Sequence, residues 1–260
     1  MGLTFKCSII RDKYAMKKII GLCLVLFALN MLGDDVIPIW DFKLDGGDFQ
    51  TIESVGTRRF RALARVPQKL EWGPGRLGGK ALYFKNNVNG KERPVSTLEI
   101  PASEHYDFSK PFTAMCWFMP GLDLNCRLQY TIFGNAPTDY GPGFRLVYGW
   151  GALVAPLGNG APKSGRGLFI PSSRLRIILG TWNHVALRYD GVVLSIFFNG
   201  VEVGAAERQI FPIEKPRFFN VGSYNGYAYG FNGAISDFKL FDQPLSSEQI
   251  LRIARNISWD

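Results

Sequence analysis

The hydrophobic pattern of this chain is clearest in residues 181–203. Three runs of apolar, β-branched and aromatic residues are separated there by Asp190-Gly191 and Asn199-Gly200. Both dipeptides are strong hairpin signals, because a type I′ turn needs positive φ at its two central residues. The segment therefore predicts an antiparallel meander of three strands, and it indicates an all-β protein.

Short apolar runs of the same kind occur along most of the remaining chain. Turn residues separate them at intervals of roughly 8–12 residues, and no helical pattern lies between them, which favours an antiparallel sandwich over a βαβ fold. Residues 45–79 are rich in Gly, Arg and Pro and are expected to be mostly loop. Outside the meander, strands are expected at 37–44, 80–84, 97–100, 111–119, 130–133, 144–148, 152–155, 167–170, 218–221 and 231–241.

One short helix is predicted near the C-terminus. Ser246 and Gln249 have the spacing of a capping box, in which each side chain accepts a hydrogen bond from a free backbone N–H of the first turn. Ile250, Leu251 and Ala254 would then face the sandwich. The amphipathic pattern indicates a packing surface more than a partner site.

The first 33 residues differ from the rest. Met16-Lys17-Lys18 precedes an apolar run over 19–32, and a basic start followed by a short apolar stretch is typical of a secretory signal peptide. We expect Met16 to be the start, residues 1–33 to be an extension with a signal peptide, and residues 34–260 to form one sandwich domain. An uncleaved N-terminal anchor is the alternative, and it would be the chain's only membrane contact.

The formal net charge of +8 is less informative than it looks. Residues 1–33 hold five Lys or Arg and one Asp, so half of the charge lies in the expected signal segment. The remaining chain has 25 basic and 21 acidic residues with no long basic run. This distribution argues against nucleic acid as a partner.

Two cysteines, Cys116 and Cys126, remain after residue 33. An even pair in an exported chain permits a disulfide. The alternative is two separate thiols, because Cys116 belongs to the apolar run 112–118. Both interpretations stay open at the level of sequence.

Several short motifs follow one another over about residues 37–255: 75–84, 98–101, 112–113 with Trp117, 181–186, 189–191, 198–200, 231–238 and 245–250. In this order they resemble the laminin-G-like jelly-roll family of the concanavalin A-like sandwich superfamily. The resemblance implies two antiparallel sheets of six or seven strands packed face to face, and it constrains function only loosely because one fold supports many roles.

Catalytic chemistry has few candidates. His184 lies on a predicted strand and fits a structural role, and His105 has no evident partner. Glycoside hydrolases of the superfamily carry alternating carboxylates on one strand, in a Glu-x-Asp-x-Glu motif or a close variant, and that pattern is absent here. The sequence therefore favours a non-catalytic protein over a divergent glycosidase.

Calcium is a cofactor that the resemblance suggests. Many laminin-G-like domains hold Ca²⁺ through an Asp just before a strand, and Asn135 and Asp139 precede the expected strand 144–148. Calcium takes six to eight oxygen ligands, and an Asx turn at these residues is the alternative. A weaker candidate for a calcium site consists of Asp45 and Asp48.

The best candidate ligand site is an aromatic loop. Tyr224, Asn225, Tyr227 and Tyr229 combine aromatic rings with amide and hydroxyl groups between two strands, and Trp150 lies in a second aromatic turn. Exposed rings of this kind stack on sugars. The alternative is that they only cap the ends of the core.

The sequence therefore favours an exported, non-catalytic binding module for carbohydrate or another extracellular ligand. It would be secreted, periplasmic or attached to the cell surface. A structural or adhesive surface protein is the first alternative, and a divergent glycoside hydrolase is the second.

Overall fold

The computed structural model describes residues 36–87, 93–101, 106–125, 127–138, 140–164, 168–170, 175–214 and 218–256. The expected signal segment, His105, Cys126 and Asp139 lie outside these residues, so the predictions that concern them are not addressed by the structure. No described helix is both long enough and apolar enough to cross a membrane.

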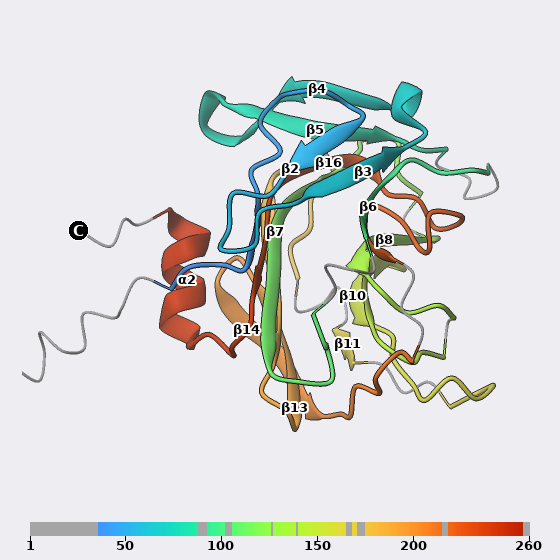
Figure 1. Cartoon of the computed structure of the whole chain (residues 1–260), viewed down its shortest axis with the longest axis vertical. Helices are drawn as coiled ribbons and strands as arrows, with labels where there is room; N and C mark the ends of the chain where they lie inside the picture. Colours follow the sequence, from blue (N-terminus) through green and yellow to red (C-terminus); the bar gives the residue numbers. More distant parts are fainter. Residues whose placement is uncertain are drawn as a thin grey trace, which may run out of the picture. The chain divides into compact units, whose positions relative to one another are not determined.

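Two antiparallel sheets of eight strands each, counted over the described residues, pack face to face (Figure 1). This arrangement confirms the predicted all-β jelly-roll sandwich. Sheet A contains β1 (Trp40–Phe42), β4 (Leu70–Pro74), β5 (Lys80–Lys85), β7 (Phe112–Pro120), β12 (Asn183–Tyr189), β13 (Val193–Phe198), β14 (Val201–Glu207) and β16 (Asn232–Phe241). Sheet B contains β2 (Thr51–Glu53), β3 (Arg61–Arg65), β6 (Thr97–Pro101), β8 (Gln129–Gly134), β9 (Arg145–Gly149), β10 (Ala152–Ala155), β11 (Leu168–Ile170) and β15 (Phe218–Val221).

The order of the strands differs between the two sheets. Sheet A runs β14-β13-β12-β7-β16-β5-β4, and β1 pairs with β16 beyond the end of β5. Sheet B runs β11-β10-β9-β8-β15-β6-β3-β2. The predicted meander is therefore β12, β13 and β14, which form one end of sheet A.

The core lies between the sheets and is rich in aromatic rings. Phe219 of β15 contacts Trp40, Phe108 and Phe238, with ring centroids 5.4, 5.2 and 5.5 Å apart. All four side chains are at most 4% exposed. Burying one such ring contributes about 2–3 kcal/mol, so contacts of this kind hold the two sheets together.

The two turns of the meander differ from each other. Asn199 and Gly200 both have positive φ, at 50° and 82°, as the type I′ prediction requires. At the other turn only Gly191 has positive φ, and the Asp190 carboxylate accepts hydrogen bonds from the N–H groups of Val192 and Val193. Three residues lie between β12 and β13, so this turn is longer than the predicted type I′ turn.

Three strands within residues 45–79 were not predicted, although most of these residues lie outside strands as expected. Strands β2, β3 and β4 lie there, together with two short 3₁₀ turns, Pro67–Lys69 and Arg76–Gly78. In β3 the buried face carries small residues, Ala62 and Ala64, while Arg61 and Arg65 point outward. Alanine has a low strand propensity, so the period-two pattern is difficult to recognise in the sequence.

Helix α2 (Ser247–Arg255) confirms the predicted cap and packing face. Ser246 Oγ accepts the Gln249 N–H at 3.1 Å, and Gln249 Oε1 accepts the Ser246 N–H at 2.7 Å. Ile250 and Ala254 are buried. The helix lies against the outer face of sheet A, where Leu251 approaches the backbone of Gly200.

Cys116 is a fully buried free thiol on the core face of β7, and burial raises its pKa. Its suggested partner Cys126 lies outside the described residues. The disulfide therefore stays a prediction.

Candidate functional site

The exposed aromatic side chains of the described residues all belong to sheet B and its loops. Tyr140, Trp150, Phe169 and Tyr227 are 39%, 52%, 54% and 53% exposed. Tyr140 lies between β8 and β9, Trp150 in the β9–β10 turn, and Phe169 on β11. Tyr227 lies between β15 and β16.

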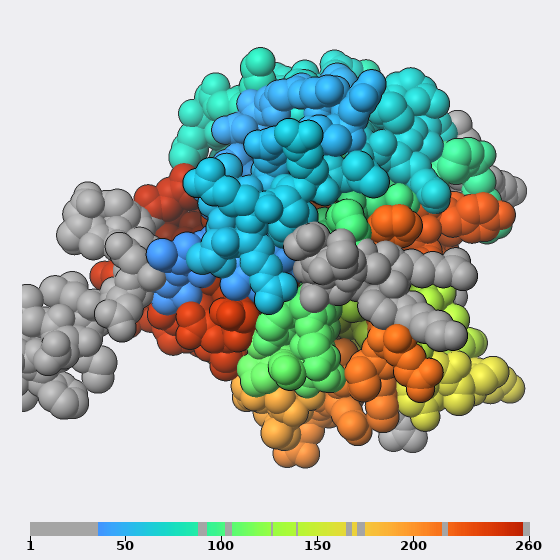
Figure 2. Space-filling view, viewed as in Figure 1, coloured from blue at the N-terminus to red at the C-terminus, as the bar shows by residue number. Residues whose placement is uncertain are grey.

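Residues 222–230, called here the tyrosine loop, form a compact turn beside β8. Tyr224 and Ala228 pair as an isolated antiparallel bridge. The Gly222 N–H donates to the Ile132 carbonyl at 2.8 Å, and the Thr131 N–H donates to the Tyr229 carbonyl at 2.9 Å. The loop, drawn in orange-red, projects at the surface in Figures 1 and 2.

Three of the predicted site residues hold this loop in place. Arg145 of β9 is 2% exposed, and its guanidinium lies 4.2 Å from the Tyr224 ring centroid and 5.6 Å from that of Tyr229. The Tyr224 hydroxyl and the Asn225 amide both donate to the Pro137 carbonyl, at 2.8 and 3.2 Å. Tyr224, Asn225 and Tyr229 are thus brought together, and the polar groups of Tyr224 and Asn225 bind the protein itself.

Tyr227 is the member of the tyrosine loop that points outward. The guanidinium of Arg93 lies 4.2 Å from its ring centroid. Arg93 is exposed, and among the described residues its side chain contacts the Tyr227 ring. A guanidinium over a tyrosine face is attracted by the ring's quadrupole.

The neighbouring Gly226 rests directly on sheet B. Arg65 Nη1 donates to the Gly226 carbonyl at 3.5 Å, and Arg65 Nε lies 3.2 Å from Glu99 Oε1. Gly226 has a φ of 61°, and a Cβ at this position would come within 2.5 Å of Glu99 Oε1. Glu99 is 6% exposed; burial raises its pKa, and Arg65 acts in the opposite direction.

Asn86 joins the two chain segments that carry Tyr227 and Arg93. Its side chain is 2% exposed and donates to the carbonyls of Ser96 and Phe231, at 3.1 and 2.9 Å. The Ser96 N–H donates back to Asn86 Oδ1 at 2.7 Å. The end of the tyrosine loop and the connection between β5 and β6 are therefore fixed to one side chain.

Trp150 does not join the tyrosines in any recorded contact. It lies beyond the C-terminal end of β9, while Arg145 lies at its N-terminal end, so about 13 Å of strand separates the two positions. Between them, the outer face of sheet B carries a row of residues in register, of which only Phe169 is exposed: Thr131, Val147, Val154 and Phe169.

Sequence reasoning missed Arg65, Arg93, Arg145 and Phe169. The alternation within β11 places Phe169 between two buried residues, so that strand offered a usable signal. The three arginines have no recognisable sequence signal, because their role depends on tertiary contacts with the tyrosine loop.

The residues suggested for calcium are only partly described. Asn135 Oδ1 accepts the Phe144 N–H at 3.0 Å, a bond that spans nine residues and is therefore not the local bond of an Asx turn. Within the described residues no group of three or more His, Cys, Asp or Glu side chains could hold a metal ion. Asp48 uses Oδ1 to accept the Gln50 N–H. The calcium prediction thus depends on Asp139, outside the described residues.

His184 is placed as a structural residue. It is 1% exposed, and its ring packs edge-on against Trp117 at 5.2 Å. Burial, together with the charges of Arg76 and Lys239, lowers its pKa to about 3. A buried imidazole that stays neutral at physiological pH and has no route to a substrate is a poor general acid or base.

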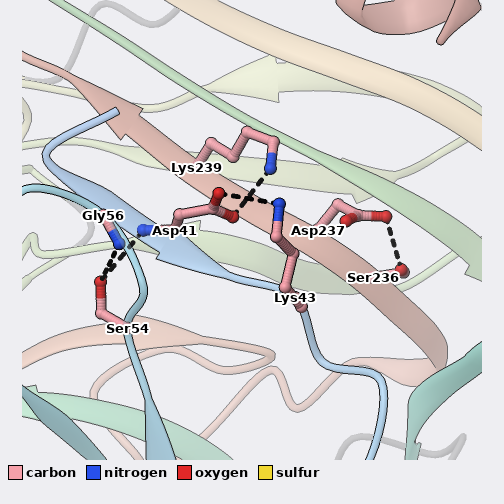
Figure 3. Close-up of polar contacts among 7 residues, drawn as sticks. All are labelled: Asp41, Lys43, Ser54, Gly56, Ser236, Asp237 and Lys239. Carbon is pink, nitrogen blue, oxygen red and sulfur yellow. Dashed lines mark hydrogen bonds and ion pairs between the residues drawn. The ribbon is translucent and has the colours of Figure 1, made fainter. Parts of the chain in front are cut away.

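The outer face of sheet A carries a partly buried charge cluster (Figure 3). Asp41 of β1 is 7% exposed and receives Lys239 Nζ at 2.7 Å and Lys43 Nζ at 2.9 Å. Burial lowers the pKa of Lys239, and Asp41 opposes that change. At the β16 bulge, Ser236 Oγ lies 2.9 Å from Asp237 Oδ2. These side chains satisfy one another, so the cluster has the properties of a structural element.

Three surface depressions lie away from the exposed rings. One of about 610 Å³ lies beside the β12–β13 turn, and one of about 510 Å³ lies between Tyr83 and Leu122. A third, of about 380 Å³, is lined by Asp45, Asp48 and Glu53. These three carboxylates are exposed, whereas the general acid of a glycosidase needs surroundings that keep it protonated.

The fold is similar to that of several solved binding domains. The binding domain of Paraclostridial Mosquitocidal Protein 1 aligns with a TM-score of 0.60 and 13% identity over 85% of this chain. The binding domain of botulinum neurotoxin DC, solved in complex with rat synaptotagmin II, aligns with a TM-score of 0.61 and 13% identity over 85% of this chain. This chain spans 52% of each of those chains, about half their length.

A third similar structure is domain 4 of AbnA, a GH43 extracellular arabinanase from Geobacillus stearothermophilus, in complex with arabinotriose. It aligns with a TM-score of 0.58 and 16% identity, covering 85% of this chain and 100% of that one. At these identities the similarity establishes the fold alone. No curated protein matches the chain significantly in sequence.

One family profile matches the sequence itself. It is described as the concanavalin A-like lectin/glucanases superfamily, and it covers residues 89–251, more than half of the chain. The match agrees with the segments that first suggested a laminin-G-like jelly roll. The two-sheet architecture agrees with both, although each sheet has eight strands where six or seven were expected. The chain therefore belongs to the concanavalin A-like lectin/glucanases superfamily.

Proposed function

We propose that this protein is an exported, non-catalytic module that binds carbohydrate on the outer face of sheet B. The observation that carries the proposal is the confinement of exposed aromatic side chains to that sheet and its loops, over the described residues. Flat rings exposed on a rigid scaffold provide stacking surfaces for the C–H faces of sugars.

Tyr227 is proposed as the principal contact, because its ring is exposed on a loop that is fixed at both ends. Tyr224, Asn225 and Tyr229 act as positioning residues. The two tyrosine rings contact Arg145, and the Tyr224 hydroxyl and Asn225 amide bind Pro137. Trp150 is proposed as a second contact, reached only by a ligand longer than one sugar.

The similarity of the fold to an arabinanase domain in complex with arabinotriose supports a sugar ligand. A protein ligand is the second candidate, supported by the neurotoxin binding domain in complex with synaptotagmin II. The sugar is preferred because the exposed groups are single rings spread over several loops, whereas a protein interface is built around a continuous buried patch.

Export is part of the proposal and depends on residues 1–33, which have the pattern of a signal peptide. N-terminal sequencing of the mature protein tests it. A mature chain that begins near residue 34 supports cleavage, and a chain that retains its apolar segment supports an anchor.

The absence of catalysis is proposed from the surroundings of the titratable groups. His184 is buried and neutral, Glu99 is paired with Arg65, and Asp41 is paired with two lysines. Release of reducing ends from any polysaccharide that binds, at a rate above that of the heat-unfolded protein, would contradict this part of the proposal.

The binding site is tested by affinity electrophoresis and calorimetry against a panel of polysaccharides. Tyr227→Ala should weaken binding about tenfold or more, because a stacked ring contributes about 1 kcal/mol beyond its buried area. Leu77→Ala is the matched control, since Leu77 is 78% exposed in the turn before β5 of sheet A. Equal binding by wild type and Tyr227→Ala would remove Tyr227 from the site, and no binding to any polysaccharide would reject the sugar proposal.

Calcium held by Asn135 and Asp139 stays a separate proposal. Melting temperatures measured with calcium and with a chelator test it, because an ion that binds only the native state must raise stability. Identical melting curves would exclude a calcium site of useful affinity.

A further inference from the structure

The chemistry around Tyr227 identifies the class of sugar that this surface fits. We infer that the ligand is an anionic glycan whose carboxylate binds Arg93 while its sugar ring lies against Tyr227. The inference rests on the proposed sugar-binding role of the same loop and adds the charge of the ligand to it.

The first argument is the state of Arg93. Its guanidinium lies over the Tyr227 ring at 4.2 Å, and among the described residues no carboxylate lies within ion-pair distance of it. No described residue accepts a hydrogen bond from the N–H groups of Arg93. Those groups match the two oxygens of a carboxylate in a two-pronged hydrogen bond.

The second argument is that the arginine is presented on a fixed support. Asn86 ties the β5–β6 connection at Ser96 to the end of the tyrosine loop at Phe231. Lys69 Nζ donates to the carbonyl of Pro94, the residue next to Arg93, at 3.2 Å. The backbone that follows Arg93 is therefore held at Pro94 and Ser96, close to the end of the loop that carries Tyr227.

The third argument concerns the surrounding charge. Arg65 lies below Gly226, and its partner Glu99 is 6% exposed while the Arg65 side chain is 47% exposed. The carboxylate of this pair is therefore buried, whereas the Arg65 side chain reaches solvent. Next to Arg93, the surface around Tyr227 presents positive charge to a ligand, and anions are attracted to it over about 8–10 Å at moderate salt.

A carboxylated sugar suits both groups at once. The carboxylate of a uronic acid projects from the sugar ring, so its oxygens can pair with a guanidinium while the ring's C–H face contacts an adjacent tyrosine. A neutral sugar would satisfy Tyr227 and leave the N–H groups of Arg93 to water. The arrangement therefore favours a polyuronate over a neutral polysaccharide.

The experiment compares polygalacturonate with its methyl ester, which has the same sugar ring and linkage but no charge. Binding is measured by calorimetry with the full chain, and dextran sulfate serves as a probe of charge alone. The wild type should bind polygalacturonate about tenfold or more tightly than the ester, and Arg93→Gln should remove that preference. Arg255→Gln on helix α2 removes the same charge from a surface that belongs to sheet A, and it should leave binding unchanged.

Each outcome decides the question. The wild type could bind polygalacturonate and its ester equally, with binding lost in Tyr227→Ala but kept in Arg93→Gln. This result would overturn the inference of an anionic ligand and leave the proposed sugar site intact. Equal loss in Arg93→Gln and Arg255→Gln, with dextran sulfate bound as tightly as polygalacturonate, would reduce the interaction to net charge and overturn the inference. Failure of every polysaccharide to bind would reject the proposed function together with it. Melting temperatures of all variants confirm that each is folded.

Discussion

The outer faces of the two sheets differ in which side chains they expose. Sheet A is covered on one part by helix α2 and carries, on another, the cluster of Asp41, Lys43 and Lys239. Sheet B carries the tyrosine loop on its outer face, and that loop and its neighbours leave aromatic rings exposed. The chain's own groups cover parts of both outer faces, but among the described residues only the loops of sheet B and Phe169 leave aromatic rings exposed.

The difference separates charged side chains that pair with one another from a charged side chain that could bind a ligand. On sheet A the charged groups pair with one another, as Asp41 does with two lysines. On sheet B the guanidinium of Arg93 lies on a ring and has no acid beside it among the described residues. Substitutions on sheet A should therefore change stability, and substitutions around Tyr227 should change binding.

Asp41→Ala should have the largest effect on stability. It would leave Lys239 largely buried without its carboxylate partner, which costs about 3–5 kcal/mol. Urea unfolding measures the loss, and Lys43→Ala is the control, because Lys43 is 46% exposed and its ion pair should contribute less than about 1 kcal/mol. Equal losses in the two variants would show that the cluster is not a structural element.

The second effect is a loss of stability in acid that depends on His184. Its pKa in the folded protein is about 3, below the ordinary value of 6.5, so between these values the unfolded chain binds a proton that the folded protein does not. Stability should be complete above about pH 6.5 and should fall as the pH is lowered, by about 2 kcal/mol at pH 5. His184→Gln should remove this part of the pH dependence of unfolding. An unchanged pH profile would contradict the buried neutral imidazole.

Ser246→Ala should have a smaller effect. The variant removes the hydroxyl that caps helix α2 and should cost about 1 kcal/mol, measured as a lower urea midpoint. Ser247→Ala is the control, because Ser247 lies one position further along the helix and is exposed. Sugar binding should be the same in both variants, and weaker binding in Ser246→Ala would link sheet A to the ligand.

Tyr227→Ala should have the smallest effect on stability, within about 0.5 kcal/mol, since the ring is 53% exposed. The same variant should have the largest effect on binding. A clear fall in its melting temperature would show that Tyr227 is part of the packing, and the contrast between the two sheets would then be lost.

The fold could be predicted well from short-range signals. The Asn199-Gly200 turn, the alternation along β7 and the cap at Ser246 are each encoded within a few residues, and all three are found. Strands β2 to β4 could not be recognised, because Ala62 and Ala64 on the buried face of β3 look like loop residues beside so much Gly, Arg and Pro.

The candidate site could be predicted only in part. Tyr227 stands in an aromatic loop that composition alone singles out, and it is exposed as expected. Tyr224 and Tyr229 face the protein because their rings contact Arg145. That residue is distant in sequence and belongs to another strand, so the contact could not be predicted. The placement of Arg93 depends likewise on Asn86, a residue with no local signature.

The hydrogen bonds of Asn86 have a consequence for the entropy of binding. Two loops that are separated by more than a hundred residues are held by one side chain, so they are ordered before a ligand arrives. Ordering a free loop on association costs affinity, and preorganisation removes that cost. Asn86 would thus strengthen binding without touching the ligand, and a weak contact through one ring and one guanidinium could still be selective.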